Sequence, residues 1–298
     1  MVVLLGGLVV DVAAHRHDHH ARGPARSPAR GPARGSATAG VARRHRVPRA
    51  HATPRVPPPA RPADPFTAPA TRTDLAARTG TITAAVEDLR THQLWLYHPG
   101  VRVQTASIEK VDILETLLHQ AEIAGEPLDD DDTDLVQGMI ENSNDEDAQD
   151  LWDSIGGSSA VAAYNSKAGL TGTVPDPDGY WGETTTSAAD QIRVLRQLVL
   201  PHGLLNRASQ DYQLGLMENV EADQAWGVSA GVAGGVSVAL KNGWVPLTGA
   251  TDWEVNSIGR IKGDGRRYLI AILTAHDPSE AYGIETIEGL SRIVWNDL

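Results

Sequence analysis

Ser107 and Lys110 are the residues whose types and spacing suit covalent chemistry most directly, within the run Thr-Ala-Ser-Ile-Glu-Lys at 105–110. Apolar residues follow at helical spacing and stop before Gly125, which predicts a helix from Ser107 to Ala124 with both side chains on one face. A serine becomes a nucleophile when a neighbour takes its proton, and a lysine takes it only when burial or another cation lowers its pKa. Taken alone, the pair is more typical of a helix-start serine beside a surface lysine.

A second candidate element is the polar run Ser143, Asn144 and Asp145. It stands where one predicted helix stops near Asn142 and the next begins, so its side chains could line a cleft. Taken alone, Ser143 and Asp145 are also ordinary helix caps.

A third candidate element is the run Lys241, Asn242, Gly243 and Trp244 at the end of a predicted strand. Its glycine allows a ligand to approach the backbone closely. The alternative is a plain strand-end turn, for which Lys-Asn-Gly is a common composition.

Lysine usage favours the chemical interpretation of these motifs. The chain has four lysines among 26 basic residues, and two of the four are Lys110 and Lys241. Arginine keeps its proton at physiological pH, so a site that moves protons is one place where it cannot replace lysine.

The elements that must position these residues follow from the hydrophobic pattern. It predicts a hairpin at 81–88 and 93–97, then a mostly helical stretch, a Gly/Pro/Asp-rich loop at 170–183, and three strands at 236–244, 253–261 and 268–274 before a closing helix. This order predicts an α+β fold, with an antiparallel sheet flanked by helices and an all-helical insertion.

Composition divides the chain of 298 residues into two parts. Residues 1–70 hold 11 arginines, no lysine and three aspartates, a net charge of +8, whereas the remainder carries −20. An acidic folded part argues against nucleic-acid binding. The sequence contains no cysteine, which excludes disulfides, thiol catalysis and cysteine zinc sites.

The N-terminal part is predicted to lie outside the folded domain. Residues 1–14 are apolar with small residues at the end, which indicates a signal-peptide remnant or, alternatively, a short disordered apolar end. Residues 15–70 are rich in Arg, Pro and Ala and are predicted to be a disordered linker or wall-spanning tether. Residues 71–298 are predicted to form the folded domain.

Together, the three motifs resemble those of the class A β-lactamase and penicillin-binding-protein superfamily of active-site serine enzymes. Its signatures SxxK, SDN and KTG occur here in order as Ser107-Ile-Glu-Lys110, Ser143-Asn144-Asp145 and Lys241-Asn242-Gly243. The resemblance covers about residues 75–298 and includes the Thr run at 184–186 after the loop.

The resemblance implies a role for each motif. Ser107 would be the acylated nucleophile and Lys110 its general base, and Ser143 would relay the proton to the leaving group with help from Lys241. The backbone N–H groups of Ser107 and Trp244 would form the oxyanion hole. Asp145, Asn242, Gly243 and Trp244 would contact substrate with Lys241, whose charge would attract a substrate carboxylate.

Three departures from the family pattern change what is expected. The loop before Thr184 has no Glu-x-x-Leu-Asn, the element whose glutamate activates the deacylating water, and Glu183 aligns better with a structural acid. Asp145 replaces an asparagine and, when ionised, accepts hydrogen bonds without donating any. Asn242 replaces a threonine or serine. We therefore expect slow deacylation and no efficient β-lactam turnover.

The sequence thus predicts a serine hydrolase that forms an acyl-enzyme at Ser107 with β-lactams, related amides or esters, or peptidoglycan-derived peptides. The alternative is a non-catalytic relative that binds cell-wall or small-molecule ligands, and a third possibility is a structural wall protein held by its basic tail. We expect a secreted or cell-wall-associated monomer with no cofactor, no metal, no transmembrane span and no nucleic-acid partner.

Overall fold

The computed structural model describes residues 62–247 and 252–298. The predictions for residues 1–14 and for the linker up to residue 61 lie outside the described residues. Helix α1 (Pro69–Ala77) crosses the predicted domain boundary at residue 71, and Phe66 is buried in the hydrophobic core. Ordered packing therefore begins before residue 71.

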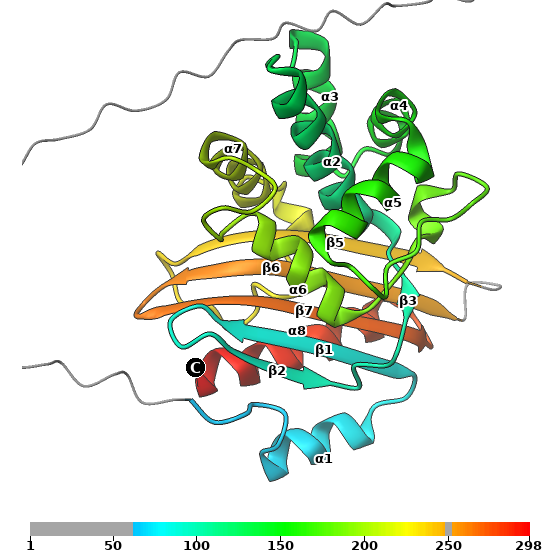
Figure 1. The fold of residues 1–298 in the computed structure, drawn as a ribbon. Helices are drawn as coiled ribbons and strands as arrows, with labels where there is room; N and C mark the ends of the chain where they lie inside the picture. Colours follow the sequence, from blue (N-terminus) through cyan, green and yellow to red (C-terminus); the bar gives the residue numbers. More distant parts are fainter. Residues whose placement is uncertain (1–61, 248–251) are drawn as a thin grey trace, which may run out of the picture. The chain divides into compact units, whose positions relative to one another are not determined.

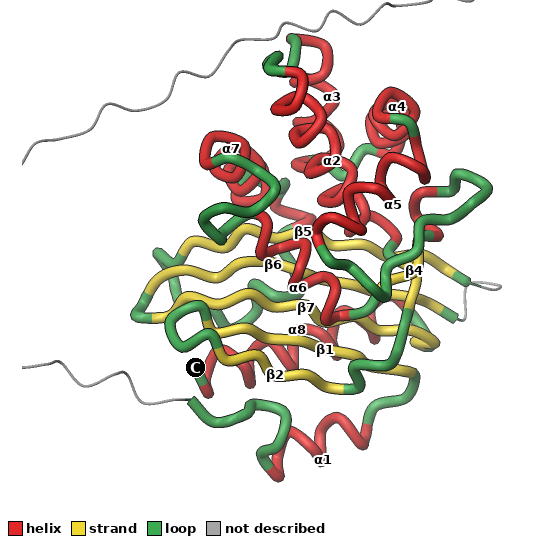
Figure 2. The backbone as a smooth tube through the Cα atoms, viewed as in Figure 1, coloured by secondary structure: helices red, strands yellow, loops and turns green. Residues whose placement is uncertain are grey.

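A five-stranded antiparallel sheet forms the centre of the domain (Figures 1 and 2). Its strands are β1 (Thr81–Asp88), β2 (Gln93–Tyr97), β5 (Ser237–Pro246), β6 (Trp253–Gly263) and β7 (Arg266–Asp277). They are arranged in the order β2-β1-β7-β6-β5, so the N-terminal hairpin pairs with the last strand, with Thr81 opposite Ala275. Two short strands, β3 (Val103–Gln104) and β4 (Thr185–Thr186), pair separately. The sheet confirms the predicted fold class.

Helices cover both faces of this sheet (Figure 1). They are α2 (Glu109–Ala124), α3 (Asp130–Glu141), α4 (Asp145–Ile155), α5 (Gly157–Ala168), α6 (Ala188–Gln197), α7 (Arg207–Glu218) and α8 (Glu280–Asp297). The insertion between β3 and β5 supplies α2 to α7 on one face, and α8 covers the other. No helix among the described residues is long and apolar enough to cross a membrane.

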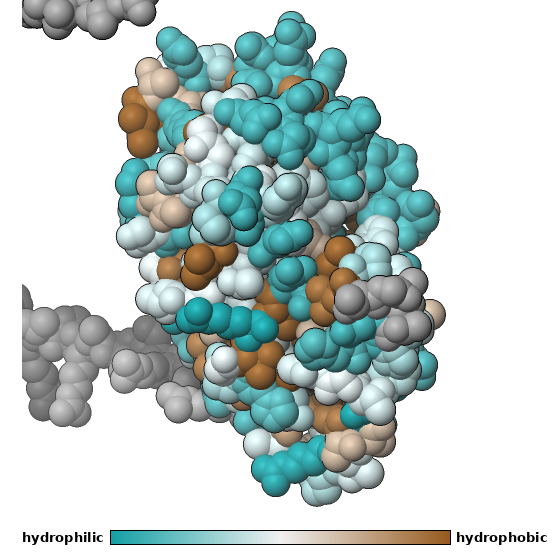
Figure 3. Space-filling model, turned by 90° about the vertical axis from the view of Figure 1, so that its right-hand side faces the viewer, coloured by the Kyte–Doolittle hydropathy of each residue, from teal (hydrophilic) through white to brown (hydrophobic). Residues whose placement is uncertain are grey.

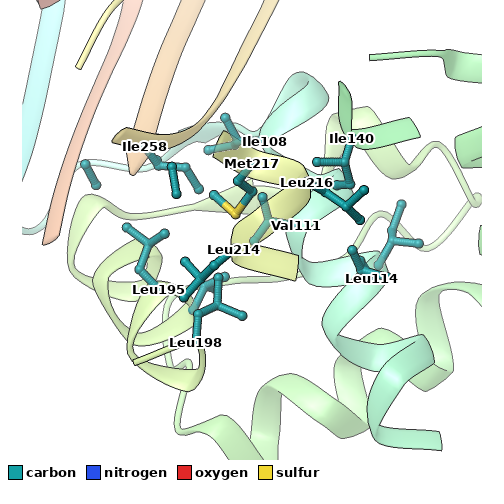
Figure 4. Packing of buried hydrophobic residues seen from close by; sticks show 14 of the residues in the cluster. Ile108, Val111, Leu114, Ile140, Leu195, Leu198, Leu214, Leu216, Met217 and Ile258 are labelled. Atoms are coloured by element: carbon teal, nitrogen blue, oxygen red, sulfur yellow. The ribbon is translucent and has the colours of Figure 1, made fainter. Parts of the chain in front are cut away.

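The period-2 pattern of the strands separates two hydrophobic clusters. Ala85 and Leu273 contribute to the cluster under the helical insertion, whereas Ala84 and Ile272 contribute to the cluster under α8. In the first cluster, side chains from α2, α3, α6, α7 and β6 meet those of the turn before α2 (Figure 4). The start of α2 is therefore fixed by packing from several sides.

Candidate active site

Ser107 lies in a 3-10 turn, η1 (Ala106–Ile108), and the α-helix begins only at Glu109. The predicted helix start at Ser107 is thus a tighter turn, because β5 passes directly against it. A Cβ added at Gly243 of β5 would lie 2.7 Å from the Ser107 backbone nitrogen, so only glycine fits there. Ala106 has a positive φ of 47°, a strained conformation that persists where the surroundings enforce it.

Lys110 is 0% exposed and its three closest acceptors are all oxygens of the run 143–145. Its Nζ donates to the Ser143 carbonyl at 2.6 Å, to Asp145 Oδ1 at 2.6 Å and to Ser143 Oγ at 3.2 Å. None of these acceptors belongs to Ser107. Burial lowers the pKa of Lys110, and the Asp145 carboxylate opposes that shift. The ring of Trp181, 5.0 Å from Nζ, covers the ammonium.

The run 143–145 is positioned by its middle residue. The side chain of Asn144 caps α4 by accepting from the backbone N–H groups of Glu146 and Asp147 at 2.8 and 3.2 Å. Ser143 has a positive φ of 57°. Because Asn144 provides the cap, Ser143 and Asp145 are not the caps that the alternative interpretation made them, and both contact Lys110.

Lys241 is also buried, with 1% of its surface exposed. Its Nζ donates to Ser143 Oγ at 2.8 Å and to the Asn242 carbonyl at 3.2 Å. No ion pair to Lys241 is found within the described part of the chain. Burial lowers its pKa well below the usual lysine value, and the nearby charge of Lys110 lowers it further. Ser143 Oγ therefore lies between two lysines that differ in their partners.

Asn242 does not reach the cleft that the sequence assigned to it. Its side-chain amide is buried and donates to the carbonyls of Gln224 and Trp226 at 2.7 and 3.2 Å. It holds the segment before β5 in place. Trp244 does reach the cleft, and its ring meets that of Trp226 edge to face at 5.8 Å.

A cleft of about 510 Å³ opens over Ser107. Its lining residues are Gln104, Ala106, Ser107, Asp145, Gln149, Tyr180, Trp181, Gly182, Glu183, Trp244, Val245, Pro246 and Leu247. Three aromatic rings and two carboxylates face this space, and none of the described lining residues is basic. A larger hollow of about 600 Å³, beside Leu118 and Tyr212, contains none of the predicted site residues.

Sequence reasoning missed three buried acids on α2. Glu109, Asp112 and Glu115 are at most 1% exposed, and none forms an ion pair with another described residue. Burial raises the pKa of Asp112 to about 7 and raises those of Glu109 and Glu115 well above the usual range. Their i, i+3, i+6 spacing on an apolar helix was the available signal. Within residues 62–247 and 252–298 no cluster of acidic, histidine or cysteine side chains could hold a metal ion.

Comparisons with known proteins bear on the family and the fold of this chain. A family model described as "Beta-lactamase enzyme family" matches residues 131–298. The "Putative lipoprotein LppW" of Mycobacterium tuberculosis is 32% identical over 231 residues, which are 75% of this chain and 72% of that protein.

Solved structures share the fold at lower identity. The structure titled "Structure of PBP-A" has a TM-score of 0.66 at 18% identity and covers 76% of this chain and 93% of its own. A beta-lactamase from Chitinophaga pinensis has a TM-score of 0.68 at 16% identity, with coverages of 76% and 96%.

Proposed function

Because the chain belongs to the beta-lactamase enzyme family, we propose that it is a serine hydrolase that forms an acyl-enzyme at Ser107. The observation that carries this proposal is that Ser107 lines the cleft one helical turn before Lys110, whose buried amine contacts Ser143 together with that of Lys241. Such a cluster can take the serine proton, which a hydroxyl must lose to attack a carbonyl.

The charge that develops on the substrate carbonyl also has partners. Ser107 stands in the 3-10 turn that leads into α2, where backbone N–H groups and the helix dipole favour negative charge. The N–H groups of Ser107 and Trp244 are the oxyanion donors we propose, and the close contact at Gly243 fixes their spacing. Asp145 and Trp244 border the acyl group in this arrangement.

We propose β-lactams, related amides and esters, and peptidoglycan-derived peptides as acyl donors, with slow hydrolysis of the acyl-enzyme. Two acids line the cleft, and one of them, Asp145, is held by Lys110. The other, Glu183, is exposed at the end of the loop, where water surrounds it. Neither is a buried carboxylate aimed at Ser107, which is what efficient activation of a deacylating water requires.

We also propose an extracytoplasmic location, because the related mycobacterial protein is named a lipoprotein. The arginine-rich residues 15–61 would then separate the domain from its point of attachment or export.

Intact-protein mass spectrometry tests the proposal. The full chain is incubated with a penicillin and, separately, with a reactive ester, and Ser107→Ala is the control. A stable adduct on the native chain alone supports acylation at Ser107 with slow deacylation. Loss of the donor without an adduct contradicts slow deacylation, and neither adduct nor loss of donor contradicts the hydrolase function.

A second candidate function is ligand binding without catalysis. The ion pair between Asp145 and Lys110 favours it, because this pair keeps a proton on a lysine that the related enzymes use as a base. Under this alternative, a β-lactam binds the native chain and Ser107→Ala with equal affinity in calorimetry, and neither protein becomes modified.

A further inference from the structure

We propose that Lys241, rather than Lys110, accepts the proton in this site, and that Asp145 is a positioning residue that keeps Lys110 as an ammonium ion. This inference rests on the proposed function, because it concerns how Ser107 becomes acylated. It reverses the roles that the family resemblance implies for the two lysines, in which Lys110 is the base and Lys241 carries the charge.

The contacts of Lys110 favour the charged form. Its two shortest contacts, at 2.6 Å, are with the Ser143 carbonyl and the Asp145 carboxylate, and both are groups that only accept hydrogen bonds. A carboxylate at this distance stabilises an ammonium ion and holds its proton. Asp147 adds a second negative charge near the same group. These contacts oppose the lowering of the Lys110 pKa by burial, and in this proposal Lys110 stays charged one helical turn from Ser107.

The contacts of Lys241 favour the neutral form. It is as deeply buried as Lys110, yet its nearest partners are a hydroxyl and a carbonyl, not a carboxylate. The charged groups that face it are the Lys110 ammonium, which repels a second cation, and the more distant Asp145. A neutral amine can accept a hydrogen bond, and in this proposal the Ser143 hydroxyl donates to Lys241 across the 2.8 Å contact, which is shorter than the 3.2 Å contact between Ser143 Oγ and Lys110 Nζ.

The proton then moves in one direction through the cluster. Ser107 Oγ attacks the carbonyl carbon and gives its proton to Ser143 Oγ, while Ser143 passes its own proton to the Lys241 amine. The carbonyl electron pair moves to the oxyanion. When the tetrahedral intermediate collapses, the bond to the leaving group breaks, and the Lys241 ammonium returns its proton through Ser143 to the leaving nitrogen or oxygen. Lys110 remains charged throughout, and its charge lowers the energy of the alkoxide that forms on Ser107.

Arginine substitutions distinguish the two lysines, because an arginine keeps its charge and cannot act as a base at neutral pH. The measured quantity is the rate of acylation of the full chain by a reactive ester, with thermal melting as the check on folding. We expect Lys110→Arg to retain acylation within about tenfold and Lys241→Arg to lose at least about 100-fold, the usual range for a general base. The reverse order, equal losses in two folded variants, or no loss in either variant overturns the assignment.

Chemical rescue covers the case in which Lys241→Arg does not fold. In Lys241→Ala, a small primary amine added to the buffer should restore acylation in proportion to its unprotonated fraction, and in Lys110→Ala it should not. Absence of rescue in a folded Lys241→Ala variant contradicts the inference.

The role of Asp145 has its own test. If Asp145 holds the proton on Lys110, the double variant Asp145→Asn/Lys241→Arg frees Lys110 to act as a base and recovers acylation at alkaline pH relative to Lys241→Arg. A purely structural role for Asp145 predicts no recovery, and that result overturns this part.

A native chain that no donor acylates contradicts the proposed function itself, whereas an acylated native chain with the wrong arginine pattern contradicts only this inference.

Discussion

Gly243 brings β5 into direct contact with the turn that carries Ser107. A Cβ at this position would lie 2.7 Å from the Ser107 nitrogen and 2.8 Å from the Ile108 nitrogen, and both are backbone atoms. We expect Gly243→Ala to lower the rate of ester acylation about 100-fold, because a displacement near 1 Å disrupts the attack geometry. Gly100→Ala is the matched control, since its Cβ meets nothing within 4 Å. Equal rates in the two variants would contradict the importance of this contact.

Charge in the cleft should determine which acyl donors react fastest. The described lining residues include the acids Asp145 and Glu183 and no basic residue, and Lys241 is buried behind Ser143. Neutral or cationic esters should therefore acylate Ser107 faster than donors with a carboxylate. This reverses the expectation that Lys241 attracts a substrate carboxylate.

Glu183→Gln tests this preference. It should raise the acylation rate for a penicillin a few-fold at low ionic strength, because it removes a repulsive charge that salt screens. Asp178→Asn changes the same net charge on the same exposed loop without lining the cleft. If Asp178→Asn gives the same increase, the effect belongs to the overall charge and not to the cleft.

Residue types and spacing were sufficient to find the candidate site, but not the partners within it. Lys110 and Lys241 both contact Ser143, and Ser107 lines the cleft three residues before Lys110. The ion pair between Lys110 and Asp145 joins positions 35 residues apart, so no local pattern reveals it. The direction of the Asn242 side chain depends in the same way on a segment that packs against it from elsewhere in the chain.

At the scale of elements, α2 carries both Lys110 and a row of buried acids. Asp112 has a pKa of about 7 in the folded state against 3.8 for an ordinary aspartate, so the folded chain keeps a proton that the unfolded chain loses. The contribution of Asp112 to the free energy of unfolding is therefore fully present below about pH 4. It decreases as pH rises and is lost above about pH 7. Each pKa unit corresponds to about 1.4 kcal/mol, which predicts a loss of a few kcal/mol from this helix.

Thermal melting of the full chain between pH 5 and pH 8 measures this effect. We expect a lower melting temperature at pH 8 and a smaller difference in Asp112→Asn. Asp74→Asn on the exposed face of α1 is the control and should leave the pH dependence unchanged. A native melting temperature that rises with pH would contradict the buried neutral acids.

Helix α7 shows why some elements escape prediction. Its buried face includes Gln210 and Gln213, and the Gln213 amide donates to the Val111 carbonyl of α2 at 2.9 Å. Polar side chains at these positions interrupt the apolar period, although the N-cap Asn206 was a readable start signal. Strands β3 and β4 have two residues each, too few for any alternation to appear.

At the scale of the molecule, the order of elements was predictable but the neighbours in the sheet were not. The alternation of strand, helical stretch and strand indicates an α+β fold on its own. The pairing of β1 with β7 brings residues 81 and 275 together, and such a contact is selected by the packing of the two hydrophobic clusters, not by local sequence.

The opposite charges of the two parts of the chain lead to a final prediction. Residues 1–70 carry +8, and all their arginines stand at or before position 61, whereas residues 71–298 carry −20. Acids fill the first turns of α3 and α4, and hydrophilic side chains dominate the upper part of the face in Figure 3. An anionic cell-wall polymer should therefore attract the N-terminal part and repel the domain.

Co-sedimentation of the full chain and of residues 62–298 with an anionic wall polymer measures this difference. We expect the full chain to bind the polymer at low ionic strength and to be released when salt shortens the screening length to about 8 Å. The shorter chain should remain in solution at both ionic strengths. Acylation of Ser107 should be the same in both, since no residue of the candidate site precedes position 104. If the shorter chain binds as well as the full one, recognition of the polymer belongs to the domain, and the basic segment is not its tether.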